Sequence, residues 1–131
     1  MSYLVDSDWI VDALAGVDSA LKVLEELSEE GLAVSIISVG EILEGAYGFP
    51  DPDSHRLRFR QFLSGFNLLD LSEPVMEVFA RIRSELRREG QLIPDFDLLI
   101  AATALHHNLV LVTRNTRHFS RIPGLRLYQS S

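Results

Sequence analysis

Short apolar runs alternate along the chain with longer stretches in which apolar residues recur every three or four positions. The short runs predict strands at residues 3–5, 32–37, 68–71, 109–112 and 125–128. The longer stretches predict helices at residues 9–14, 18–30, 39–47, 57–63, 73–89 and 98–105, with a further helical turn inside 114–121. This alternation predicts an α/β fold with a mostly parallel sheet, and right-handed crossovers place helices on both of its faces.

Side-chain caps are predicted where several of these helices begin. Ser7 or Asp8 precedes the first helix and can accept a hydrogen bond from its free backbone N–H groups. Ser38 and Glu41 have the spacing of a capping box at the helix that follows the second strand. Asp95 is the predicted cap of the apolar helix through 98–105.

A second pattern concerns polar residues that follow strands or begin helices: Asp6, Glu41, Asp97 and Asn115. Asp6 ends the first strand, and Asn115 comes just after the strongly apolar strand at 109–112. Glu41 lies about one turn beyond the second strand, and Asp97 lies in the first turn of its helix. In a parallel α/β sheet these positions share the edge formed by the carboxyl ends of the strands. We therefore expect the four side chains to converge.

Converging carboxylates raise one another's pKa values, because like charges at close range favour protonation. A divalent cation offsets that repulsion, and magnesium prefers oxygen ligands while needing only a few carboxylates. A bound magnesium ion lowers the pKa of a coordinated water and stabilises charge on a phosphoryl oxygen. Phosphodiester hydrolysis needs both effects, so the pattern favours a magnesium-dependent phosphodiesterase site.

Each of these residues also has a purely structural explanation. Asp6 is also suited to be a helix cap, and Glu41 to complete the capping box with Ser38. Asp97 is also favourable near the positive end of a helix dipole, and Asn115 is a common turn residue. Their shared placement at one edge of the sheet is what favours a common site.

Composition narrows the class of protein. The 131 residues fit one domain spanning residues 1–131, and the 47% hydrophobic content favours a globular fold. A net charge of −7 argues against a coat protein that binds nucleic acid through a global positive field. Without cysteine the chain has neither disulfides nor thiolate metal ligands. We see no apolar run of membrane-spanning length and no signal segment, so we expect a cytoplasmic protein without membrane contact.

Four segments carry a resemblance to the PIN-domain family, specifically to its VapC-type toxins. They are LVDS at 4–7, IISVGEI at 36–42, DLLIAATA at 97–104 and LVTRN at 111–115. Phe119 and the Pro123-Gly124 turn resemble the end of the family's pattern. The segments occur in the family's order and extend over nearly the whole chain.

The resemblance implies a three-layer α/β/α sandwich of PIN type, with four to five strands, and a metal-dependent endoribonuclease. Asp6, Glu41 and Asp97 would be the acidic site residues. Asp6 and Asp97 would be direct Mg²⁺ ligands, and Glu41 would either bind the metal through a water molecule or orient the attacking water. Manganese would be a substitute for magnesium. Asn115 takes a position that is often acidic in the family, and His118 stands where many relatives have aspartate. We therefore expect one well-held ion.

The resemblance also implies an RNA substrate, a cognate antitoxin protein and a homodimer. The main alternative is a non-catalytic RNA-binding or regulatory PIN-like module with a degraded metal site, which Asn115 supports. A receiver-type phospho-acceptor domain needs a lysine near its acids, and Lys22 lies inside an early helix. A DNA-directed nuclease shares the metal chemistry, but the short chain favours RNA. Thr113 and Ser38 are candidates to support the site, and Arg114, Arg117 and His118 are candidates to hold RNA phosphates.

Overall fold

The computed structural model describes residues 1–129 of the chain. The strands are β1 (Tyr3–Val5), β2 (Leu32–Ser35), β3 (Asn67–Leu69) and β4 (Val110–Val112). The helices are α1 (Ser7–Leu14), α2 (Asp18–Ser28), α3 (Ile36–Ala46), α4 (Pro52–Leu63), α5 (Glu73–Arg88), α6 (Asp95–His106) and α7 (Thr116–Phe119). No helix in this described part of the chain combines the length and the apolar character needed to cross a membrane.

The strands form one parallel sheet in the order β3-β2-β1-β4. Leu4 of β1 pairs with Ala33 of β2 on one side and with Leu111 of β4 on the other. The predicted α/β class with a parallel central sheet is confirmed, with four strands. The expected strand at 125–128 is reduced to a single bridge, in which Leu127 pairs with Leu111.

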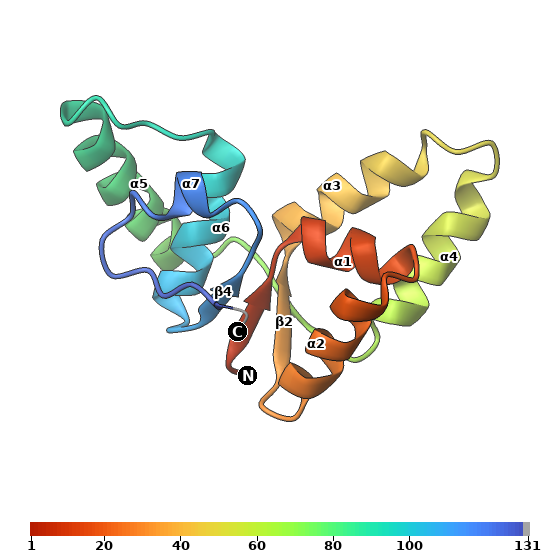
Figure 1. Cartoon of the computed structure of the whole chain (residues 1–131). Helices are drawn as coiled ribbons and strands as arrows, with labels where there is room; N and C mark the ends of the chain where they lie inside the picture. The colour runs from red at the N-terminus through yellow and green to blue at the C-terminus, as the bar shows by residue number, and fades with distance from the viewer. Residues whose placement is uncertain (130–131) are drawn as a thin grey trace.

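Successive residues of the strands face opposite layers of helices, because side chains alternate across a sheet. In β1, Leu4 belongs to a core shared with α5 and α6, whereas Val5 packs in a core with α1 and α3. Figure 1 shows the two layers, with α1 to α4 on one side of the strands and α5 to α7 on the other. The three-layer α/β/α arrangement is therefore as expected.

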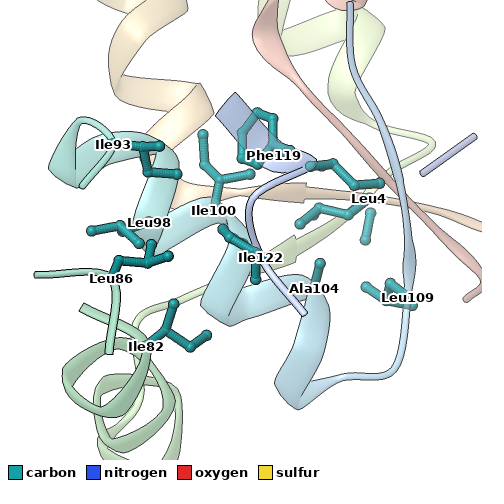
Figure 2. Close-up of a cluster of buried hydrophobic side chains, with 13 residues drawn as sticks. Leu4, Ile82, Leu86, Ile93, Leu98, Ile100, Ala104, Leu109, Phe119 and Ile122 are labelled. Atoms are coloured by element: carbon teal, nitrogen blue, oxygen red, sulfur yellow. The ribbon is translucent and has the colours of Figure 1, made fainter. Parts of the chain in front are cut away.

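The core between the sheet and α5 to α7 is shown in Figure 2. Leu98 and Ile100 of α6 are nearly inaccessible to solvent and lie among Ile82, Leu86 and Phe119. This packing explains why α6 is apolar on most of its faces: it lies between the sheet and the surrounding helices α5 and α7. Helix α6 is thereby held firmly, and with it the acidic residues of its first turn.

The second strand ends earlier than the sequence pattern suggests. Strand β2 stops at Ser35, and α3 begins at Ile36 rather than after Ser38. Ser35 is the N-cap, with its hydroxyl accepting a hydrogen bond of 3.1 Å from the Ile37 N–H. The β-branched residues Ile36 and Ile37 suit a strand, but the cap at Ser35 and burial of the helix override that local preference. The prediction of Ser38 as the cap was wrong.

The order of the strands creates a switch in direction at β1. The chain runs from β1 outward to β2 and β3, and then returns to place β4 on the other side of β1. Crevices form at such switch points, beyond the carboxyl ends of the strands. Asp6 follows β1 at this point, and its backbone N–H donates a hydrogen bond of 2.9 Å to the Val112 carbonyl of β4. The ends of β1 and β4 are thus fixed side by side.

Candidate active site

Asp6 is a buried carboxylate at the junction of β1 and α1, with 7% of its surface exposed. Its Oδ1 accepts a hydrogen bond of 2.8 Å from the Ser7 N–H, so Asp6 is the cap of α1 in place of the predicted Ser7 or Asp8. Its Oδ2 accepts one of 2.7 Å from the Thr113 hydroxyl. Burial raises the pKa of Asp6 to about 6, helped by the charges of Asp8 and Asp97, while the Thr113 hydrogen bond acts in the opposite direction.

Glu41 lies on α3, facing the start of α1. Its Oε1 accepts a hydrogen bond of 3.3 Å from the Ser7 hydroxyl. The predicted capping box with Ser38 is therefore wrong, because α3 starts earlier and Glu41 lies beyond its first turn. Burial raises the pKa of Glu41, and the neighbouring charge of Asp6 raises it further. Glu41 is therefore close enough to Asp6 for their charges to interact.

Asp97 lies in the first turn of α6 and is mostly buried, with 17% of its side chain exposed. His118 Nδ1 lies 2.7 Å from its Oδ2, and Asn115 Nδ2 lies 3.3 Å from the same oxygen. A carboxylate only accepts hydrogen bonds, so His118 donates through a protonated Nδ1. Both donors act on Oδ2, which leaves Oδ1 available for another ligand.

Thr113 connects the two halves of the site. Its hydroxyl donates to Asp6 and accepts a hydrogen bond of 3.1 Å from the Asn115 N–H. A continuous set of side-chain and backbone contacts thus joins the predicted acids, in the order Glu41, Ser7, Asp6, Thr113, Asn115 and Asp97. All four residues that the sequence pattern placed at one edge of the sheet are brought together there.

Some contacts of the site were not expected from the sequence. His118 was a candidate for binding phosphate, whereas it contacts Asp97 directly. Asn115 and His118 are three residues apart, which places their side chains on one face of a helical turn, and this spacing is the signal that could have indicated the contact. Ser38 does not support the site: its hydroxyl is buried and makes no hydrogen bond within residues 1–129.

Two flanking carboxylates have structural roles instead. Asp8 accepts hydrogen bonds from the backbone N–H groups of Trp9, at 2.7 Å, and of Arg114, at 2.9 Å. Asp95 is not the cap of α6, where Pro94 takes the N-cap position; it pairs with Arg83 of α5 at 2.9 Å. Asp8 therefore anchors the segment after β4, and Asp95 anchors the first turn of α6.

The donor set suits a hard divalent cation held by few protein ligands. Asp6 has only neutral hydrogen-bond donors, and the nearby charges of Asp8 and Asp97 are negative, so a cation would relieve the cost of its buried charge. Over residues 1–129, no three acidic or histidine side chains converge closely enough to enclose an ion by themselves. Magnesium usually retains several waters and binds through one or two carboxylates, which fits an open site of this kind.

Comparisons with known proteins place the chain among nucleases. The sequence profile of the PIN domain matches residues 3–125. The ribonuclease VapC2 of Rickettsia felis is 33% identical over 129 residues, covering 97% of this chain and 96% of that protein. The tRNA(fMet)-specific endonuclease VapC of Shigella flexneri is 26% identical over 126 residues, covering 96% of each.

Solved structures give the same result. VapBC2 from Rickettsia felis, bound to a DNA fragment from its promoter, contains a chain that matches with a TM-score of 0.92 and 31% identity over 100% of both chains. DNA-bound VapBC from Salmonella typhimurium matches with a TM-score of 0.90 and 26% identity, covering 98% of this chain and 97% of that one.

Proposed function

The chain belongs to the PIN domain family, and from that premise we propose that it is a magnesium-dependent endoribonuclease that acts as the toxin of a toxin–antitoxin pair. The observation that carries the proposal is the continuous set of contacts from Glu41 through Asp6 to Asp97 at the carboxyl edge of the sheet. The named ribonucleases among its relatives support the same chemistry.

Asp6 and Asp97 are the proposed magnesium ligands, and manganese is the proposed substitute. In each of these two aspartates a hydrogen bond to one oxygen fixes the orientation of the carboxylate. Thr113 donates to Asp6, and His118 donates to Asp97. A bound ion would lower the pKa of a coordinated water and offset charge on a phosphoryl oxygen. Partners that orient metal-binding carboxylates strongly affect metal affinity.

Glu41 is the proposed residue that orients the attacking water and accepts its proton. The Ser7 hydroxyl holds Oε1 and leaves Oε2 for that role. Burial and the charge of Asp6 raise the pKa of Glu41, and a base is most effective when its pKa lies near the working pH. The Asn115 amide does not act as a base at neutral pH. Its proposed role is to donate a hydrogen bond to Asp97.

Cleavage of purified RNA tests the proposal. The wild-type protein is expected to cut transfer or messenger RNA in Mg²⁺ or Mn²⁺ and to be inactive in EDTA. Asp97→Asn is expected to be inactive while remaining folded by circular dichroism. The matched control is Asp95→Asn, which makes the same change two residues away at an exposed position and is expected to stay active. Wild-type protein that binds RNA without cutting it in either metal would instead identify a non-catalytic RNA-binding module.

The toxin role predicts a protein partner. We propose that a cognate antitoxin covers the apolar hollow of about 340 Å³ between α1, α3 and α4, which Glu41 also lines. Val11 and Phe49 line this hollow and are each 50% exposed, so an apolar segment of the partner would cover them. Co-expression with the cognate antitoxin, which we expect to be a small protein encoded by a neighbouring gene, is expected to suppress RNA cleavage. Val11→Asp should abolish that suppression without loss of cleavage.

The remaining proposals concern assembly and location. We propose a homodimer, which light scattering of the purified protein would measure directly. We also propose that the protein acts in the cytoplasm, because its proposed substrate is cellular RNA. Expression without the antitoxin is expected to slow bacterial growth, whereas expression of Asp97→Asn to the same level should not.

A further inference from the structure

An open hollow of about 400 Å³ lies beside the acids, on the side of Thr113 that faces the end of the chain. Its walls come from α1, from the segment after β4 and from the segment at residues 127–129, and they include Trp9, Arg114, Thr116 and Tyr128. Thr113 belongs both to this hollow and to the site, because its hydroxyl donates to Asp6. The hollow and the proposed metal site are therefore separated by one side chain.

Arg114 is fixed in place by three separate contacts. Its backbone N–H donates to Asp8, and its Nε and Nη2 both lie 3.0 Å from the same oxygen of Asp12. Its guanidinium carbon lies 4.1 Å from the centre of the Trp9 ring, the geometry of a cation–π contact. An arginine on a loop normally samples many rotamers, so this set of contacts holds the charge at one position.

The fixed guanidinium still has free donors. Asp12 takes the hydrogens on the Nε side, and 46% of the Arg114 side chain remains exposed. The Nη1 and Nη2 hydrogens on the opposite edge form the planar fork that matches two oxygens of a phosphate group. The exposed hydroxyl-bearing residue Thr116 lines the same hollow and adds a neutral donor.

Aromatic rings form the other part of the hollow. Tyr128 meets the Trp9 ring edge to face, with ring centres 6.3 Å apart, and it is only partly buried. Trp9 is buried, with 6% of its surface exposed, so Tyr128 is the ring that a base could reach. In single-stranded nucleic-acid sites bases commonly stack on such rings while phosphates contact a nearby cation. The Trp9 indole N–H is buried and makes no hydrogen bond within residues 1–129.

We propose that this hollow binds one nucleotide of a single-stranded RNA, adjacent to the bond that is cut, with its phosphate on Arg114 and its base against Tyr128. This inference rests on the proposed ribonuclease function and adds a substrate-positioning subsite to it. The net charge of −7 and the cluster of Asp6, Asp8 and Asp97 oppose the approach of a polyanion. A cation fixed next to those acids is what allows a phosphate to lie there.

Trp9 provides a direct measurement, because it is the only tryptophan of the chain and lines the hollow. A single-stranded RNA of roughly ten nucleotides, added to the wild-type protein in EDTA so that no cleavage occurs, is expected to change the Trp9 fluorescence in a saturable way. Arg114→Gln is expected to weaken that binding about tenfold and to reduce the slope of log affinity against log salt by about 1. In cleavage, KM should rise about tenfold while kcat changes by less than about twofold.

Two further variants separate phosphate binding from a structural role of Arg114. Asp12→Asn breaks the ion pair but keeps the cation, so RNA should bind at least as tightly as to wild type; weakening equal to that of Arg114→Gln would show a structural role and overturn the inference. Arg88→Gln makes the same change of charge on the last turn of α5, where Arg88 is exposed, and should leave affinity and salt slope unchanged. Inorganic phosphate, added at a concentration equal to that of the phosphate groups of the RNA, should not displace the RNA.

The outcomes distinguish the subsite from the function on which it rests. If the wild type neither binds nor cuts RNA, the proposed function fails. If the wild type cuts RNA but Arg114→Gln behaves like Arg88→Gln, the function stands and the subsite is wrong. RNA binding that leaves the Trp9 fluorescence unchanged would likewise place the RNA elsewhere.

Discussion

His118 Nδ1 lies 2.7 Å from Asp97 Oδ2, so a histidine of α7 holds a carboxylate of α6. The short distance is typical of a hydrogen bond to a charged acceptor. Asn115 donates to the same oxygen, so both donors act on Oδ2 and leave Oδ1 of Asp97 for the proposed ion. His118 is thus a positioning residue.

Removing this histidine is predicted to weaken metal binding. His118→Ala leaves Asp97 free to rotate, and the loss of a residue that orients a metal ligand typically costs about 10- to 100-fold in metal affinity or activity. The magnesium concentration that gives half-maximal cleavage should rise by that factor. His106→Ala provides the control. His106 is exposed and lies at the end of α6 opposite to Asp97. An unchanged magnesium requirement in His118→Ala would contradict the positioning role.

Asp6→Asn is predicted to stabilise the metal-free protein while abolishing cleavage. Burial raises the pKa of Asp6 from 3.8 to about 6 in the folded state, so the folded protein binds the proton more tightly than the unfolded chain does. Stability from this group is therefore present below about pH 4 and is lost as the pH rises to about 6. The difference of about 2 pKa units corresponds to about 3 kcal/mol at neutral pH.

Thermal unfolding in EDTA measures this effect. Asp6→Asn should unfold at a higher temperature than wild type at pH 8. The two should converge at about pH 3, below the unfolded-state pKa of 3.8, where Asp6 is largely protonated in both states. Magnesium should raise the unfolding temperature of the wild type at pH 8 but not that of the variant. A variant that is less stable than wild type at pH 8 would show that the Asp6 charge is better compensated than its surroundings indicate.

The convergence of Asp6, Glu41, Asp97 and Asn115 was predictable because it depends only on topology. Asp6 and Asn115 follow parallel strands, Asp97 lies in the first turn of α6, and Glu41 lies in the second turn of α3. In a parallel sheet the carboxyl ends of the strands and the helices that follow them share one edge. The starts of the helices were less predictable. Ile36 and Ile37 look like strand residues, and only the cap made by Ser35 and the burial of α3 place them in a helix. Local pattern does not contain that tertiary information.

The contacts between the site residues could not be read from the sequence either. That Glu41 contacts Ser7, and that Asp97 contacts His118, depends on how α3 and α7 lie against the edge of the sheet. The expected last strand is a different case, because here the sequence predicted a longer strand than the structure contains. Residues 125–128 have strand-like composition, yet within residues 1–129 only Leu127 of this segment forms a bridge with β4. Composition indicates a preference for extended backbone, whereas pairing requires a neighbour along the whole segment.

Thr113→Val is predicted to make cleavage more sensitive to acid. The substitution keeps the shape of the side chain but removes the hydroxyl that donates to Asp6 over 2.7 Å. That hydrogen bond lowers the pKa of Asp6, so its loss raises the pKa further and increases competition between protons and the metal. Cleavage should fall about tenfold at pH 6 and by less at pH 8. Thr113→Ser retains the hydroxyl and should follow the wild-type pH profile; an equal loss at both pH values would contradict the explanation.

Asn115→Asp is predicted to trade stability of the metal-free protein for tighter metal binding. Asn115 Nδ2 lies 3.3 Å from Asp97 Oδ2, so an aspartate at this position would replace a donor by a like charge. In EDTA the repulsion should lower the unfolding temperature, because two carboxylates this close oppose each other's ionisation. In magnesium the additional carboxylate becomes a ligand, so the ion should raise the unfolding temperature by more than in wild type. Calorimetric titration of magnesium should correspondingly give a lower dissociation constant.

The matched control for that change is Asn108→Asp. Asn108 lies just after α6, has a left-handed backbone with φ of 56°, and accepts a hydrogen bond from Arg126, all of which aspartate can maintain. It adds the same charge at the opposite end of α6 from Asp97, so it should leave magnesium affinity unchanged. If Asn115→Asp and Asn108→Asp bind magnesium equally well, Asn115 does not lie close enough to the ion to act as a ligand, and the amide at this position serves only to hold Asp97.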